Sequence, residues 1–548
     1  MIEKTPNDTL SLWLEEGSRL IPENFDVFRT LVAQAKDLAQ RGKYDAAAVY
    51  AEMAAFHAQW KHPGLFVSPE LEHILHIIGH KGISKSLYSS KTITSDGKIK
   101  NILHVASNIS ILGGIPRFIW RLIQQDGERS HSLALTKQAP DEVPQIFRDA
   151  VNNSNGKIHV LNESIGGLVS RAKRLRKIAA TADVVLLHTW DHDAIPCIAF
   201  ADKEQSPPII FVNHSDHGFW LGVNISNVVA NLRSSGMHLS QERRSIETKR
   251  NALLPTILNP IYRKLSRTEA KQQLGIDESS VILVSIARSP KYKTIDGVSF
   301  ADAHVPLLKQ YNQAILIVIG PGDSEDWSAA IQQTQGRIKV LGETENTSVF
   351  YQAADIYVDS FPWTSITSLL EAGSYGVPLV SRYPYSSNAC GILGADMPGL
   401  TGNLIRVQKL EEYTQILSRL IIEEEFRLSL GEATRRKIAQ THWGNNWQRS
   451  LNDVYVLATT LPRVTLTPDV KDKMFLGEPD VFLPVVIGKD FDFDGMIQSR
   501  LTIMPFSERL RHWLRLVKKY GVHRRIGLLF PEWFHLRYYS RLRSFLPF

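Results

Sequence analysis

A cluster of hydroxyl side chains stands where a short β-rich run gives way to a predicted helix. The cluster consists of Thr364, Ser365, Thr367 and Ser368, and apolar residues with helical spacing follow it. The N-terminus of a helix has free N–H groups and the positive end of the helix dipole, so it suits a phosphate. Glu371 lies about two turns into the helix. It is near enough to reach a sugar hydroxyl beside such a phosphate.

Histidine and aspartate side chains follow two apolar runs that we expect to be strands. They are His188 and Asp191 after the run 183–187, and His214, Asp216 and His217 after the run 209–212. In open α/β sheets, ligands bind at the carboxyl ends of the strands, where these side chains would lie. Imidazole and carboxylate groups can contact an acceptor there or take a proton from a hydroxyl. They lack a clear metal-ligand spacing, so we predict no metal site.

Cationic side chains follow another predicted strand in the second half of the chain. They are Arg288 and, five residues later, Lys293, with Lys291 as an alternative to Lys293. Positive groups at such a strand end can neutralise charge that builds up on a departing diphosphate. In the first half of the chain, Gly113 and Gly114 would let backbone amides approach a phosphate closely, because glycine has no side chain.

Alternating strands and helices are expected to position these groups. The pattern predicts an α/β fold with two Rossmann-like domains that face a crevice, preceded by a helical extension and followed by a basic tail. The expected divisions are a helical domain (1–95), an acceptor-side Rossmann-like domain (96–262), a nucleotide-sugar-binding Rossmann-like domain (263–462), and a linker with an amphipathic tail (463–548).

Two sequence segments resemble glycosyltransferases. LLEAGSYGVPLV, which contains Glu371, is similar to the donor-site helix of GT-B glycosyltransferases, above all of the retaining GT4 family. GGIPRF, which contains Gly113 and Gly114, resembles the glycine loop in the first domain of GT4 enzymes. The resemblance covers roughly residues 100–460. It implies the two-domain GT-B fold and transfer of a sugar from a nucleotide diphosphate, with a UDP-sugar favoured.

The resemblance also implies a role for each site residue. Glu371 would bind the ribose, His214 would face the donor phosphate and the reacting carbon, and Gly113 and Gly114 would close over the donor. Arg288 and Lys293 would clamp the diphosphate, and the strand end with Gly342 and Glu343 would hold the base. The implied reaction is retaining, needs no cofactor or bound metal ion, and has a glycan, lipid-linked or other hydroxyl as its acceptor. An inverting reaction is the alternative, and it would need a side-chain base, for which His214, Asp216 and His217 are candidates.

One position departs from the family pattern. GT4 enzymes usually have a second Glu eight positions before the first, and here Trp363 occupies that place. The turn WTSITS is also similar to the phosphate turn of GT41 enzymes, which glycosylate proteins. One alternative is therefore a GT41-like protein glycosyltransferase, with residues 1–95 docking a protein partner. The other is a GT-B-shaped binding or assembly protein that no longer turns over.

Length and composition set limits on the class of protein. A chain of 548 residues is too long for one core, and its 43% hydrophobic and 22% charged content is typical of globular proteins. Two cysteines cannot form a disulfide framework, which indicates a reducing compartment. No apolar signal core opens the sequence and no long apolar run occurs. We expect a cytoplasmic protein, with a peripheral position on the inner face of the membrane as an option.

The net charge of +7 is concentrated in the tail. Residues 503–548 contain ten Lys or Arg and two acidic residues, whereas the first 502 residues have 53 basic and 54 acidic residues. Because the body is nearly neutral, we predict no nucleic-acid binding. Basic residues beside amphipathic aromatic residues suit an anionic membrane surface, and packing of the tail on the enzyme is the alternative.

Overall fold

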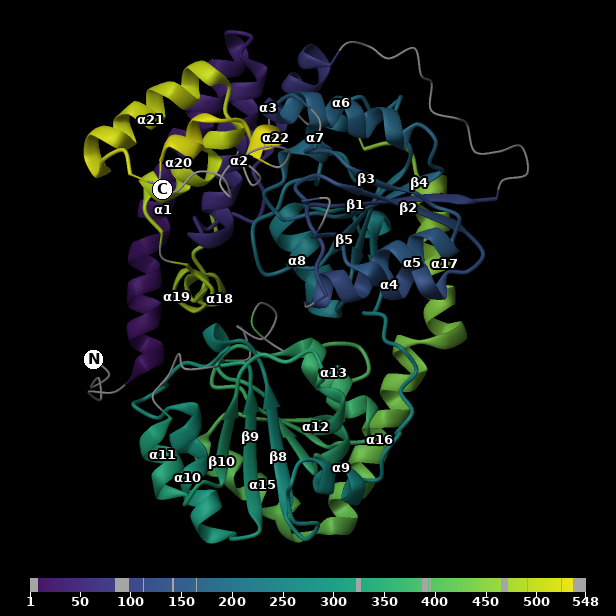
Figure 1. Cartoon of the computed structure of the whole chain (residues 1–548), viewed down its shortest axis with the longest axis vertical. Coiled ribbons are helices and arrows are strands. Elements are labelled where there is room, and N and C mark those ends of the chain that lie inside the picture. Colours follow the sequence, from purple (N-terminus) through teal and green to yellow (C-terminus); the bar gives the residue numbers. More distant parts are fainter. Residues whose placement is uncertain are drawn as a thin grey trace, which may run out of the picture.

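The computed structural model describes most of the chain. The described residues are 8–83, 98–111, 113–139, 142–163, 165–321, 327–386, 393, 396–464, 472–489, 491–523 and 525–535. Two α/β domains lie one above the other, and helices from both ends of the chain gather beside the upper, first domain (Figure 1).

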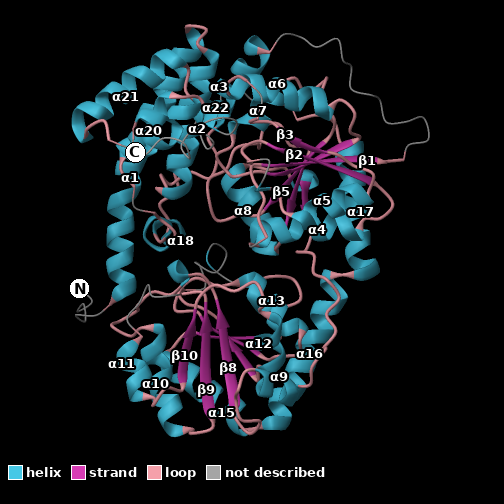
Figure 2. Ribbon diagram, in the orientation of Figure 1, coloured by secondary structure: helices cyan, strands magenta, loops and turns pink. Residues whose placement is uncertain are grey.

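A parallel sheet of seven strands forms the centre of the first domain (Figure 2). Its strands are β1 (Asn101–Ala106), β2 (Ser130–Leu135), β3 (Ile158–Val160), β4 (Val184–His188), β5 (Ile209–Asn213), β6 (Val228–Asn231) and β7 (Asn251–Leu253). The order is β3-β2-β1-β4-β5-β6-β7. The associated helices are α4 (Gly114–Gln125), α5 (Gln145–Asn153), α6 (Leu168–Ala179), α7 (Ala194–Ala199) and α8 (Ser234–Arg244). Apart from Asn101 at the start of β1, the residues of the central strands β1, β4 and β5 are buried, as expected for a parallel sheet covered on both faces.

A second parallel sheet has six strands in the order β10-β9-β8-β11-β12-β13. They are β8 (Val281–Ile286), β9 (Ala314–Ile319), β10 (Ile338–Leu341), β11 (Ile356–Val358), β12 (Leu379–Arg382) and β13 (Leu404–Val407). Its helices are α9 (Arg267–Gln273), α10 (Phe300–Gln310), α11 (Ser328–Gln333), α12 (Ser348–Ala353), α13 (Ile366–Ser374), α15 (Leu410–Ile422) and α16 (Glu424–His442). The prediction of two doubly wound domains is therefore confirmed.

The next helix, α17 (Gly444–Thr460), crosses back to the first domain (Figure 1). Its buried Trp447, Leu451 and Tyr455 join the core that covers one face of the first sheet. The predicted division 263–462 thus includes a helix that packs on the other domain. Periodicity indicates a helix but does not indicate which sheet the apolar side of that helix will cover.

The two ends of the chain pack together. Three helices begin the described chain: α1 (Thr9–Gln40), α2 (Tyr44–Trp60) and α3 (Pro69–Gly82). The last helices are α18 (Glu478–Val481), α19 (Leu483–Val486), α20 (Phe493–Arg500), α21 (Phe506–Tyr520) and α22 (Glu532–Phe534). Tyr50 on α2 and His512 on α21 are joined by a 2.7 Å hydrogen bond, and Arg500 lies 3.2 Å from Glu52. Up to residue 535, the tail therefore packs on the rest of the protein. Residues 536–548, which belong to the predicted amphipathic tail, lie outside the described residues.

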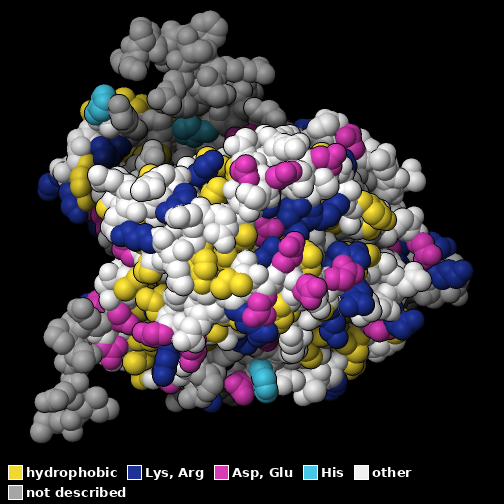
Figure 3. Space-filling view, turned by 90° about the horizontal axis from the view of Figure 1, so that it is seen from below, with side chains coloured by type: hydrophobic (Ala, Val, Ile, Leu, Met, Phe, Trp, Pro, Cys, Tyr) yellow, Lys and Arg dark blue, Asp and Glu magenta, His cyan; other side chains and the backbone are white. Residues whose placement is uncertain are grey.

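Within the described residues, no helix has the length and apolarity needed to cross a membrane. Acidic and basic side chains are interspersed on the face of the second domain seen in Figure 3. This mixture agrees with the near-neutral charge of the first 502 residues.

Candidate active site

The strand order reverses at corresponding places in the two sheets. In the first sheet the reversal lies between β1 and β4, and in the second it lies between β8 and β11. A topological switch point opens a crevice at the carboxyl ends of the strands, where α/β proteins bind ligands. Residues that follow these strands line neighbouring cavities between the two domains.

A buried carboxylate, that of Asp359, accepts hydrogen bonds that position the hydroxyl-rich turn before α13. Asp359 accepts a 2.9 Å hydrogen bond from the Ser365 backbone N–H and a 3.2 Å bond from Ser381 Oγ. Burial raises the pKa of Asp359 to about 6. The Ser365 side chain does not cap the helix, so the first N–H groups of α13 remain available to a ligand in the adjoining cavity.

A cavity at the N-terminus of α13, which we call the helix-end cavity, brings many predicted residues together. It is lined by Gly113, Gly114, Arg288, Glu343, Ser365, Thr367, Ser368 and Glu371. The backbone of Gly113 has a φ of 108°, which favours glycine. A Cβ at position 114 would lie 3.2 Å from Thr367 Oγ1. The glycine pair of the first domain therefore lies directly against the hydroxyl turn of the second.

The two lysines after β8 have different environments. Lys291 lines the helix-end cavity, and its Nζ donates a 2.8 Å hydrogen bond to the Thr364 carbonyl. Lys293 turns away and donates to the Val485 carbonyl at 2.8 Å, beside the Trp13 ring. Burial lowers the pKa of Lys291 to about 8, so its ammonium group is still mostly protonated at neutral pH. Lys291, the alternative considered from the sequence, is thus the lysine that the fold brings to Arg288.

Glu371 forms an ion-pair cluster across the two domains. It is on α13, and its carboxylate accepts hydrogen bonds from Arg117 at 2.9 Å and Arg121 at 3.0 Å, both on α4. All three side chains are largely buried. A ribose hydroxyl bound by Glu371 would therefore share the carboxylate with these arginines, because a carboxylate has several acceptor sites.

The adjoining crevice cavity contains the end of β5. It is lined by His214, Asp216, His217, Lys291, Thr364 and Trp363, among others. Asp216 makes a bidentate pair with Arg233 at 2.6 and 2.7 Å. Although burial opposes it, the Arg233 guanidinium holds the pKa of Asp216 well below its ordinary value. Asp216 is therefore poorly suited to take a proton at neutral pH.

A side cavity opens next to the crevice cavity and shares His217 and Trp363 with it. Its wall includes Asp191 and residues Gln59 and Trp60, at the end of α2. The Gln59 side chain donates a 2.9 Å hydrogen bond to Asp191. Burial raises the pKa of Asp191 to about 7. The helical N-terminal region thus contributes directly to the wall of the site.

His188 and Gly342 have different positions from the other predicted site residues. His188 is buried behind His214, and neither it nor Gly342 lines any of the three cavities. Gly342 follows β10, next to Glu343 of the helix-end cavity. That Gly342 lies beside a base stays a prediction.

The second domain is similar to a known protein family. Residues 266–437 match the family model for glycosyl transferases group 1. The matched residues lie within the second domain. The chain is a glycosyltransferase. Its two α/β domains with parallel sheets are of the GT-B type, as the sequence resemblance implied.

Individual relatives are distant. N-acetyl-alpha-D-glucosaminyl L-malate synthase of Bacillus anthracis is 24% identical over 298 residues, which are 49% of this chain and 73% of that protein. A glycosyltransferase from Rickettsia africae ESF-5 superposes with a TM-score of 0.51 at 12% identity, covering 66% of this chain and 99% of the other. Anabaena Alr3699/HepE, in complex with UDP, has a TM-score of 0.51 at 13% identity, with 66% and 100% covered.

Some residues of the glycosyltransferase site escaped the sequence analysis. Arg117, Arg121 and Arg233 were not proposed, yet they pair with predicted carboxylates. Arg117 lies three residues after Gly114, so a search of the first turn of the helix for cations could have found it. Arg233 has no comparable signal, because its partner Asp216 is 17 residues away and follows a different strand.

Among the described residues, no group of three or more His, Cys, Asp or Glu is arranged to hold a metal ion. That a bound metal is not needed stays a prediction.

Proposed function

We propose that this glycosyltransferase moves a sugar, with retention, from a nucleoside diphosphate donor to an acceptor hydroxyl, and that the donor is a UDP-sugar. One observation carries the proposal. The N-terminus of α13, Arg288, Lys291 and Glu371 converge on one cavity that the glycine pair closes from the opposite domain. Such a combination of cations and helix N–H groups fits a diphosphate.

The electrostatics of the cavity favour departure of the nucleotide. Arg288, Lys291 and the dipole of α13 are fixed before reaction, so they can stabilise the developing negative charge without rearranging. Glu371 would bind the ribose. The base would lie beside Glu343 and Tyr351, which line the same cavity. These groups take the role that a metal ion has in other sites, so we propose a reaction that needs none.

Retention is proposed from the environment of the nearby carboxylate and imidazoles. Asp216 is paired with Arg233 and is not available as a base. His214 would orient the reacting sugar, and an oxygen of the departing phosphate would take the proton of the acceptor. The UDP complex of Alr3699/HepE, which has the same fold, supports uracil as the base to test first.

The acceptor is proposed to enter through the side cavity. Trp60 and Trp363 supply aromatic surface there, and Asp191 and His217 supply polar groups. Apolar faces with a few convergent polar groups suit a sugar ring, so we propose the end of a glycan as acceptor. A lipid-linked glycan would place its lipid outside this cavity. A protein acceptor, as in GT41-like enzymes, remains the second candidate because α2 forms part of the wall.

The function is tested by calorimetry with UDP and GDP compounds. We expect Arg288→Ala and Lys291→Ala each to weaken binding of the preferred nucleotide about tenfold or more, since each removes a charge-assisted contact. Lys293→Ala is the matched control and should leave affinity unchanged, because its amine bonds the Val485 carbonyl. If Arg288→Ala and Lys291→Ala both bind every compound as the parent does, the proposed donor site is wrong. NMR of the product anomer decides retention.

A further inference from the structure

A chain of four buried histidines crosses the first sheet. His131, His104, His188 and His214 belong to or directly follow the neighbouring strands β2, β1, β4 and β5. His131 is opposite Ile102, two residues before His104, and His188 is opposite Ala106, two residues after His104. Leu187 is opposite Phe211, so His214 is likewise displaced two residues from His188. A step of two keeps all four side chains on one face of the sheet.

Hydrogen bonds connect the imidazoles in sequence. His131 Nδ1 lies 2.9 Å from His104 Nε2, His104 Nδ1 lies 3.1 Å from His188 Nε2, and His188 Nδ1 lies 3.1 Å from His214 Nε2. His104 and His131 are fully buried and His188 nearly so, beneath a face covered by α4 and α17. The last imidazole, His214, reaches the crevice cavity.

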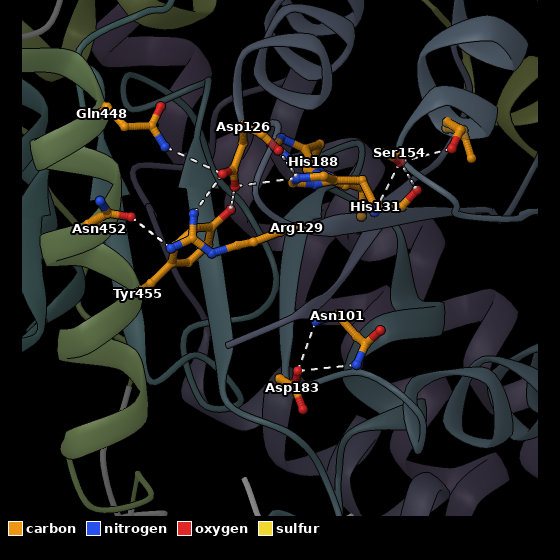
Figure 4. Close-up of polar contacts among 12 residues, drawn as sticks. Asn101, Asp126, Arg129, His131, Ser154, Asp183, His188, Gln448, Asn452 and Tyr455 are labelled. Atoms are coloured by element: carbon orange, nitrogen blue, oxygen red, sulfur yellow. Dashed lines mark hydrogen bonds and ion pairs between the residues drawn. The ribbon is translucent and has the colours of Figure 1, made fainter. Parts of the chain in front are cut away.

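The contacts of His131, at the end of the histidine chain away from the crevice cavity, determine the direction of hydrogen-bond donation along it. His131 Nε2 lies 3.1 Å from the Asp126 backbone carbonyl and 3.3 Å from its Oδ2 (Figure 4). Arg129 donates to the same carboxylate at 2.6 Å, and Tyr455 on α17 donates at 3.3 Å. A backbone carbonyl accepts only, and the pKa of Asp126 is lowered, against burial, by the hydrogen bond from His131 and by the Arg129 guanidinium, so the carboxylate also accepts only. His131 Nε2 must therefore be the donor.

When all four rings are neutral, the N–H on His131 Nε2 determines the tautomers of His104, His188 and His214. Burial lowers the pKa of His104 and His188 well below its ordinary value and that of His214 to about 3, so these rings are neutral at pH 7. A neutral imidazole has one N–H and one lone pair. If His131 is neutral as well, each Nδ1 accepts from the next Nε2–H, which makes His214 an Nε2–H donor to His188. A doubly protonated His131 would instead donate from Nδ1 and reverse every link. Within the described residues, Nδ1 of His214 has no hydrogen-bond partner.

We propose that His131 is neutral like the other three rings, and that His188, His104 and His131 are positioning residues that hold His214 in the Nε2–H tautomer, so that its Nδ1 accepts a hydrogen bond from a substrate hydroxyl. An isolated imidazole could exchange tautomers, and its Nδ1 would then present an N–H to the substrate in place of a lone pair. The chain of histidines opposes this exchange because it would require every link to reverse. His131 would then have either to present a lone pair to the Asp126 carbonyl or to take up a second proton in a fully buried place. The substrate part rests on the proposed function, whereas the tautomer part does not.

The tautomer is measured directly in the full-length protein with ¹⁵N-labelled histidine side chains, using proton–nitrogen correlations, with His214→Asn to assign the signals. We expect His214 to carry its proton on Nε2. A proton on Nδ1 of His214 in the wild-type protein would overturn the inference. This measurement needs no activity, so it separates failure of the tautomer from failure of the proposed glycosyl transfer.

Two isosteric variants at His104 test the link to catalysis. His104→Asn keeps an acceptor oxygen near the place of Nδ1, whereas His104→Leu leaves His188 Nε2–H without an acceptor. We expect His104→Leu to shift His214 toward the Nδ1–H form and to lower kcat about tenfold with donor affinity unchanged. His104→Asn should retain the tautomer and most of kcat. Equal loss of kcat in both variants, with the wild-type tautomer kept in both, would contradict the positioning role.

Discussion

Two buried aspartates after neighbouring strands have opposite proton affinities. Asp216 follows β5 and pairs with Arg233, so its pKa is lowered despite burial. Asp191 follows β4 and accepts from the neutral Gln59 amide, so burial prevails and its pKa rises to about 7. Desolvation disfavours a carboxylate unless an opposite charge compensates for it. Of these two aspartates, Asp191 is therefore the one that changes charge near neutral pH.

The pKa of Asp191 predicts a pH-dependent acceptor KM. Above pH 7 the carboxylate predominates and is a stronger acceptor for a hydroxyl, so we expect the acceptor KM to fall as the pH rises from about 6 to 8. Asp191→Asn should abolish this dependence while leaving donor affinity unchanged. Steady-state kinetics across that range provide the measurement, and an unchanged profile in the variant would exclude Asp191.

The same shift has a consequence for stability. The folded state holds the Asp191 proton more tightly than the unfolded chain, whose Asp pKa is about 3.9. Stability contributed by this group is therefore lost as the pH rises from about 4 to 7. The difference in stability between Asp191→Asn and the parent should therefore favour the variant more at pH 8 than at pH 4. Thermal unfolding of both proteins at the two pH values measures this difference.

At the scale of elements, the site depends on α4 and α13 facing each other from different domains. Gly114 at the start of α4 lies against Thr367 in the first turn of α13. One turn further along α4, Arg117 reaches Glu371 of α13. A close backbone approach and an ion pair therefore join the same two helices, and the helix-end cavity lies between them.

A larger side chain at position 114 should separate these helices. We expect Gly114→Val to weaken donor binding about tenfold, because the added atoms would press on the Thr367 hydroxyl. Gly127→Val is the control, since a Cβ there meets no atom within 4 Å. Calorimetry with the preferred nucleotide measures the effect, and equal affinity of the two variants would show that the close approach is unimportant for the donor.

At the scale of the whole molecule, α1 joins the two α/β domains. Its first residue bonds the second domain, where the Thr9 N–H donates to Asp296 Oδ1 at 2.9 Å. Further along, Phe28 and Leu31 pack in the core shared with α2 and the first domain. A helix of 32 residues is about 48 Å long, which is enough to pass alongside both domains (Figure 1).

We propose that the outer side of α21 contacts an anionic membrane, in a peripheral position. Phe506 and Leu514 are 65% and 54% exposed on this helix, which also carries Arg511, Lys518 and Lys519. Leu516 and Met504 are buried, so deleting the tail would open the core and point variants are the better test.

Leu514→Glu should reduce flotation with vesicles that contain phosphatidylserine. The expected loss is about tenfold in apparent affinity, because the change removes apolar contact and adds a repelled charge. Leu428→Glu on α16 is the matched control, since Leu428 is 41% exposed on the second domain. Equal flotation of the two variants and the parent would refute contact through α21.

The sequence by itself determined the local elements and much of the donor cavity. Strand runs, the hydroxyl turn, Glu371, Arg288 and the glycine pair are local signals, because each depends on periodicity or on residues close together in the chain. Two Rossmann-like domains and the GT-B resemblance followed from those signals.

Tertiary structure decided which groups meet. It places Lys291, and not Lys293, in the helix-end cavity and pairs Asp216 with Arg233. It also packs α17 against the sheet of the first domain. It also aligned four histidines from separate strands into one chain. These outcomes depend on strand order and register, which arise from packing between segments distant in the sequence and leave no local pattern to detect.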